Sequence, residues 1–87
     1  MSENIRYHAA GHLAAALLLC LEHPAEARVV LREVKNFVDH PMVRAPEQVK
    51  GLLSQAYENP AGCQKELTML EAWFVDPFNT VIERSES

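Results

Sequence analysis

The chain has 87 residues, of which 48% are hydrophobic and 23% are charged, and its formal net charge is −4. A chain of this length forms one domain, with a core near the lower size limit for independent folding, and its composition excludes a disordered protein. Twelve acidic side chains against eight basic ones, with no dense basic run, argue against a protein that binds nucleic acid.

The first predicted element is a helix over about residues 4–22, which contains the most apolar stretch of the chain, residues 7–21. Pro24 ends this helix because it disfavours helical geometry at the residue before it. The side chains are small or aliphatic on nearly every side, so we expect the helix to be the buried centre of a small bundle. Gly11 lies among alanines, which fits the close approach of a neighbouring backbone.

The second predicted element is a helix over about residues 25–38, with Pro24 at its start, where a missing amide proton does no harm. Its apolar side chains recur at helical spacing and form one stripe, while the charged side chains lie mostly elsewhere. The stripe consists of Ala27, Val30, Leu31, Val34, Phe37 and Val38. Because the link between the first two helices is short, we expect them to form an antiparallel hairpin.

Two further helices are predicted over about residues 46–58 and 63–75, separated by a turn at 59–62. Their apolar faces are Val49, Leu52, Leu53, Ala56 and Tyr57 in one, and Leu67, Leu70, Trp73 and Phe74 in the other. Asp76-Pro77 either kinks the last helix or caps a short fifth helix over 77–83, whose apolar positions are Phe78, Val81 and Ile82, before a polar tail over 84–87. The sequence therefore predicts an all-α fold, a compact bundle of four helices, or five with the short C-terminal one, built from antiparallel helical hairpins.

Two histidines in the first helix are candidate metal ligands. His8 and His12 are four residues apart, which places them on one face of a helix, one turn from each other. Such a pair can bind zinc, nickel or copper weakly, whereas a firm site needs three or four ligands. The alternative is that one imidazole faces solvent and the other forms a hydrogen bond with a neighbouring loop or subunit.

The segment from Tyr7 to His12 resembles the HEAGH form of the HExxH zinc-peptidase helix, which is typical of membrane-associated ATP-dependent zinc proteases. The resemblance implies that His8 and His12 would be zinc ligands. The position of the general base is occupied by Ala9, which cannot accept a proton, so hydrolysis is not expected. The resemblance covers under a tenth of the chain, and His23, Glu33, Asp39 and His40 are equivalent candidates for a third ligand.

Large side chains near the C-terminus are candidate contacts with a partner. Trp73, Phe74 and Phe78 surround a proline, and Met69 lies one turn before Trp73. Aromatic side chains, Met and Arg are enriched at protein interfaces. These residues are therefore either core or an exposed aromatic surface for partner binding.

The two cysteines, Cys20 and Cys63, are expected to be reduced thiols, although a disulfide between them is the other option. The apolar run at 13–21 is much shorter than the roughly twenty residues of a membrane span. We therefore expect a cytoplasmic protein that does not contact a membrane.

The sequence favours a non-catalytic helical module that binds another protein or itself, as an adaptor, chaperone or inhibitor, with a homodimer as the expected assembly. No cofactor and no catalytic residues are expected, because no complete catalytic set is present. The competing hypothesis is a metal-binding protein that uses His8 and His12, with zinc as its metal. A small DNA-binding regulator is a third hypothesis, for which Arg28, Arg32 and Lys35 are the suggestive set.

Overall fold

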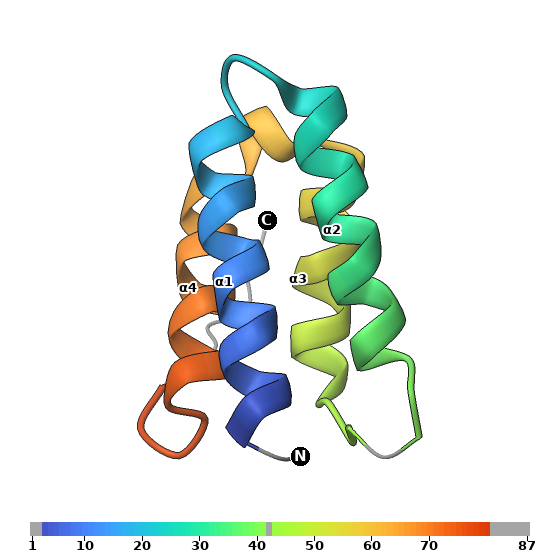
Figure 1. Cartoon of the computed structure of the whole chain (residues 1–87), viewed down its shortest axis with the longest axis vertical. Coiled ribbons are helices and arrows are strands. Elements are labelled where there is room, and N and C mark those ends of the chain that lie inside the picture. Colours follow the sequence, from blue (N-terminus) through green and yellow to red (C-terminus); the bar gives the residue numbers. More distant parts are fainter. Residues whose placement is uncertain (1–2, 42, 81–87) are drawn as a thin grey trace.

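A computed structural model of the chain describes residues 3–41 and 43–80, which fold as an all-α bundle. The elements are α1 (Glu3–Leu19), α2 (Pro24–Val38), α3 (Glu47–Glu58), the short 3₁₀ helix η1 (Pro60–Gly62) and α4 (Gln64–Val75). Successive helices run in alternating directions, so the molecule is an up-and-down bundle of two antiparallel hairpins (Figure 1). The predicted fold class is confirmed.

The core lies between the four α-helices, and α2, α3 and α4 bury the faces predicted for them. The buried residues of these three helices are Ala27, Leu31, Val34 and Val38; Val49, Leu52, Leu53 and Ala56; and Leu67, Leu70, Trp73 and Phe74. Val30, Phe37 and Tyr57, which were also predicted to lie on apolar faces, are half-buried and pack against this core. Helical periodicity therefore identified the inward side of each of these helices.

The helix α1 is not the buried centre of the bundle, and this part of the prediction is wrong. It packs against α2 and α4, while α3 packs against α2 and α4 on the other side, so α1 is one of four corners (Figure 1). Its inward face buries Ala9, Leu13 and Ala16, but the side chain of Leu18 is 85% exposed. Each helix of a four-helix ring has only two close neighbours, which leaves an outward face whatever its composition.

Two local details of α1 also differ from the prediction. The helix ends at Leu19, three residues early, and the amide of His23 donates to the carbonyl oxygen of Leu19 at 2.7 Å to close the following turn. A methyl group added at Gly11 would meet no atom within 4 Å outside its own helix, and Gly11 is exposed. Gly11 is therefore not the site of a close backbone approach.

The described start of the segment after α4, residues 77–79, forms a turn where a short fifth helix over 77–83 was predicted to begin. The Asp76 carboxylate accepts hydrogen bonds from the Asn79 backbone amide at 3.3 Å and from its side-chain amide at 2.9 Å, as at a helix start. Residues 77–79 nevertheless make only a turn, and Thr80 donates back to the carbonyl of Ala72 at 3.2 Å. The remainder of the predicted helix and the predicted tail, residues 81–87, lie outside the described residues.

In the described parts of the chain, no helix is long and apolar enough to cross a membrane.

Candidate functional site

The histidine pair of α1 has the geometry expected from its spacing. The ring centroids of His8 and His12 are 4.6 Å apart, and both rings meet Phe37 of α2 edge-on, with centroid distances of 5.8 and 6.5 Å. Nδ1 of His12 lies 2.9 Å from the carbonyl oxygen of His8. A neutral imidazole that donates from Nδ1 keeps the lone pair of Nε2 available, so the pair offers at least one nitrogen to a metal.

A third metal donor does not join the pair. Within residues 3–41 and 43–80, no group of three His, Cys, Asp or Glu side chains is placed to hold a metal ion, so His23, Glu33, Asp39 and His40 do not complete a site. Ala9, at the position that the peptidase resemblance assigns to the general base, is fully buried. Among the described residues, the arrangement therefore supplies at most two imidazoles at the surface and no third donor for a closed metal site.

The predicted aromatic surface divides into buried and exposed residues. Phe74 is fully buried and Trp73 is 9% exposed, with their rings edge to face at 4.9 Å between centroids. They belong to the core, since α4 packs against α1 and α3 and buries both side chains, so the alternative that these two residues form an exposed partner surface is wrong. Met69 is half-buried against the same core, whereas Phe78, in the turn after α4, is 95% exposed.

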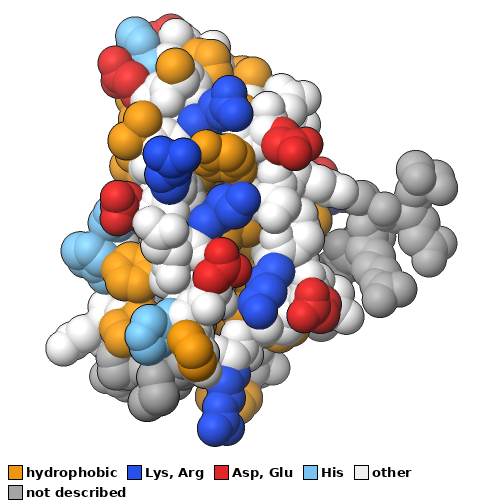
Figure 2. Space-filling model, turned by 90° about the vertical axis from the view of Figure 1, so that its right-hand side faces the viewer, with side chains coloured by type: hydrophobic (Ala, Val, Ile, Leu, Met, Phe, Trp, Pro, Cys, Tyr) orange, Lys and Arg blue, Asp and Glu red, His pale blue; other side chains and the backbone are white. Residues whose placement is uncertain are grey.

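A different surface combines charge, an aromatic ring and concave shape. Arg28, Arg32 and Lys35 follow one another at four- and three-residue spacing on α2, which places them on one face of the helix. That face is opposite in character to the buried stripe, because the amphipathic pattern directs Leu31 and Val34 inward. Basic side chains gather over the middle of the side formed by α2 and α3 (Figure 2). We call this surface, completed by Tyr57 of α3, the α2–α3 groove.

Tyr57 is the centre of the groove. The guanidinium carbon Cζ of Arg28 lies 4.9 Å from the centroid of the Tyr57 ring, and Nζ of Lys35 lies 4.7 Å from it. Both distances are within the roughly 6 Å over which a cation is attracted to an aromatic ring. These contacts hold the two cations across the half-buried ring, but an uncharged ring does not neutralise them.

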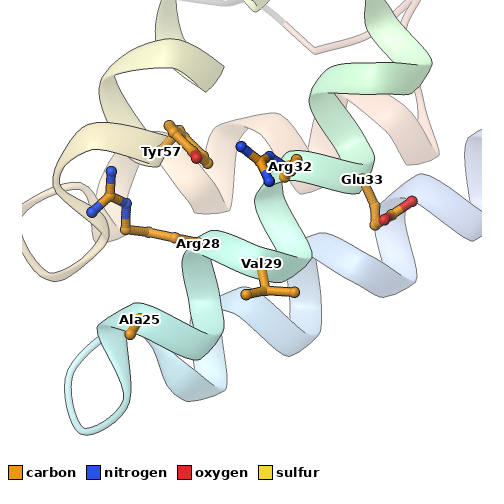
Figure 3. A pocket seen from close by; sticks show the side chains of 6 residues that line it. All are labelled: Ala25, Arg28, Val29, Arg32, Glu33 and Tyr57. Atoms are coloured by element: carbon orange, nitrogen blue, oxygen red, sulfur yellow. The ribbon is translucent and has the colours of Figure 1, made fainter.

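Two hollows lie along the groove and share Arg32 and Tyr57. The first has a volume of about 410 Å³, and its lining adds Ala25, Arg28, Val29 and Glu33 (Figure 3). The second has a volume of about 340 Å³, and its lining adds Lys35, Asn36 and Asp39. The first hollow is partly apolar, because Ala25 and Val29 form one side of it and Val29 is 67% exposed.

The charge of the groove differs from that of the whole chain. Its three cations are opposed by Glu33 and Asp39, which leaves a local excess of positive charge on a protein whose net charge is −4. In the parts of the chain that the structure describes, the only partner of Arg28 and Lys35 is the Tyr57 ring, and Arg32 has none. All three cations are therefore available to an external anion.

Sequence reasoning missed the groove because it weighed the three cations only as a DNA-binding set and assigned Tyr57 to an apolar face. The regular spacing of Arg28, Arg32 and Lys35 was a visible signal. The position of Tyr57 beside them depends on how α3 packs against α2, which the sequence pattern does not specify.

Neither cysteine is arranged as a nucleophile. Both thiols are free, with Cys20 buried and Cys63 half-buried. Burial raises the pKa of the Cys63 thiol, and the negative charge of Glu66 raises it further. A thiol with a raised pKa keeps its proton at neutral pH and reacts slowly. The Cys63 thiol instead donates to the carbonyl oxygen of Gln55 at 3.6 Å.

Comparison with protein-family models, curated proteins and solved structures finds no match to this chain.

Proposed function

We propose that this protein is a small, non-catalytic interaction module that binds another protein through the α2–α3 groove. The observation that supports the proposal is the set of three cations along the hollows beside Tyr57, none of which has an acidic partner among the described residues. These cations are solvated in the unbound protein. When a partner binds, they can form charge-assisted hydrogen bonds with its acceptor groups, next to a partly apolar hollow. A binding role as an adaptor, chaperone or inhibitor uses such a surface without chemistry.

The proposed partner is a protein, in a cytoplasmic setting. The two free thiols suit a reducing compartment, and this is the ground for proposing the cytoplasm. A protein partner is preferred to a nucleic acid because the chain is acidic as a whole.

The test is site-specific photo-crosslinking in the native cell. A benzophenone amino acid replaces Val29, which lines the first hollow of the groove, and in a matched variant it replaces Lys65, which is exposed on α4 and lines neither hollow. We expect a discrete adduct with one protein from position 29, its loss when Arg32→Glu is added, and direct binding of that protein once purified. Adducts from both positions, or persistence in Arg32→Glu, would contradict the assignment of the groove.

Self-association is a second proposed interaction, supported by exposed leucines. Leu18 near the end of α1 is 85% exposed, and Leu21, three residues later in the following turn, is 62% exposed. Light scattering after size exclusion tests it. A homodimer that becomes monomeric in Leu18→Lys supports the proposal, and a monomer at high concentration removes it.

A further inference from the structure

We propose that the α2–α3 groove recognises an acidic segment of its partner in which an aliphatic or aromatic side chain precedes or follows a run of carboxylates. The inference rests on the proposed function and adds the chemistry of the ligand. Apolar and charged groups follow one another along the groove in a fixed order.

The groove runs along α2 and changes character from one end to the other. From Ala25 to Asp39, fourteen residues along the helix, the surface is about 21 Å long, since a helix rises about 1.5 Å per residue. An extended peptide covers that length with about six residues. The ligand is therefore a short segment, and the two hollows offer it two successive positions.

The first hollow can seat an apolar side chain. Ala25 and Val29 lie one helical turn apart on α2, with Arg28 and Arg32 beside them (Figure 3). Val29 is 67% exposed, so covering it removes apolar surface from water and favours binding. An aliphatic or aromatic side chain therefore matches the apolar lining at this end of the groove.

The cations specify carboxylates beside that anchor. A guanidinium binds a carboxylate through two parallel hydrogen bonds, and Arg28 and Arg32 are one turn apart, so they can bind neighbouring carboxylates. Lys35 continues the same row into the second hollow. Because the Tyr57 ring already holds Arg28 and Lys35 in place, less side-chain freedom is lost when a ligand binds.

The same features disfavour a nucleic acid. Binding of single strands relies on aromatic faces that stack on bases, whereas the Tyr57 ring already has cations at 4.9 and 4.7 Å from its centroid. Glu33 and Asp39 also line the hollows and would repel a regular row of phosphates. A peptide can place its carboxylates at the cations and neutral or basic groups near these two acids.

The experiment measures fluorescence anisotropy of labelled probes with the full chain. The probes are a short peptide with a leucine beside a run of glutamates, the same peptide with serine in place of leucine, the same peptide with glutamines in place of glutamates, and an oligo-dT strand. We expect the first peptide to bind most tightly, with each replacement weakening binding about tenfold or more. We expect oligo-dT to bind more weakly than the first peptide at physiological salt.

Matched variants locate the binding. Arg32→Glu should weaken binding of the first peptide more than tenfold, and Lys65→Glu, which changes the net charge equally on α4, should leave it within about twofold. Val29→Ser should remove the advantage of the leucine peptide over the serine peptide. Circular dichroism of each variant confirms that it is folded.

Three results would overturn the inference: equal binding of the glutamate and glutamine peptides, equal loss in Arg32→Glu and Lys65→Glu, or tighter binding of oligo-dT. If any one of these results is found while the photo-crosslink at position 29 still identifies a protein, the proposed function stands and only the ligand chemistry is wrong. If the crosslink is also absent, both fail.

Discussion

The helices α1 and α2 lie side by side and expose opposite kinds of surface. The outward side of α1 includes Leu18 and Tyr7, which are 85% and 54% exposed, and the helix also carries the histidine pair. The outward side of α2 carries Arg28, Arg32 and Glu33. When a helix has a clear apolar stripe, as α2 does, the sequence alone identifies which face is buried and which face is exposed. When a helix is apolar on nearly all sides, as α1 is, the buried face can be identified only from the positions of the neighbouring helices.

The first prediction separates the leucines of α1 that belong to the core from those that face solvent. Leu13 is fully buried and Leu18 is 85% exposed on the same helix, so the same substitution can be made at both. We expect Leu13→Ala to lower the free energy of unfolding by about 2–5 kcal/mol. Leu18→Ala should change it by less than about 0.5 kcal/mol. Urea denaturation followed by circular dichroism measures both, and losses of similar size would mean that α1 is surrounded on all sides.

The second prediction concerns Gly11, because a glycine inside α1 lowers the free energy of unfolding relative to alanine. A Cβ at this position meets no atom within 4 Å outside its own helix, so Gly11→Ala should raise the free energy of unfolding by about 1 kcal/mol. Gly62 is the control, because a Cβ there would collide with the side chain of Asn59, which accepts a hydrogen bond from the Gly62 amide. Gly62→Ala should destabilise. A loss of stability in Gly11→Ala would show that another chain or segment approaches α1.

How far the sequence predicted this structure depends on the kind of information each feature needs. Periodicity suffices to predict the inward faces of α2, α3 and α4, because a helix with one apolar stripe can bury it in only one orientation. It does not separate Phe74 from Phe78, two aromatic residues on either side of Pro77, of which one is fully buried and the other 95% exposed. Their difference depends on where α4 ends, and the Asp76 turn decides that.

The candidate site also divides into contacts within one helix, which the sequence predicted, and contacts between helices, which it did not. The spacing of His8 and His12 correctly predicted that their rings would be adjacent, because both lie on one helix. The contact of Arg28 with Tyr57 joins α2 to α3 across 29 positions of sequence, and no local pattern encodes it. Features that lie within one helix were predictable, and features that need two packed helices were not.

The third prediction sharpens the account of α2 by measuring how strongly its cations are held on Tyr57. In a double-mutant cycle of Arg28→Gln and Tyr57→Leu, we expect a coupling free energy of about 0.5–1 kcal/mol, typical of a cation beside an aromatic ring at the surface. Urea denaturation of the four proteins in the cycle measures it. Arg44→Gln, an exposed cation in the loop before α3, should show no coupling to Tyr57→Leu. A cycle that sums to zero would mean that the guanidinium of Arg28 moves freely and that the groove is not preorganised.

The fourth prediction concerns zinc binding by the histidine pair on α1. Two imidazoles without a third donor among the described residues should bind zinc weakly, and binding to the folded state alone stabilises it only as the zinc concentration exceeds the dissociation constant. We expect a rise in melting temperature that appears only in a large excess of zinc over protein and is absent in His12→Ala. His40→Ala, a histidine on a different segment, is the control and should keep the rise. Zinc retained in equal amount with protein purified without a histidine tag would contradict this expectation. It would require a further donor from outside the described residues or from a second copy of the chain, and the outward side of α1 would then be a binding surface of equal standing to that of α2.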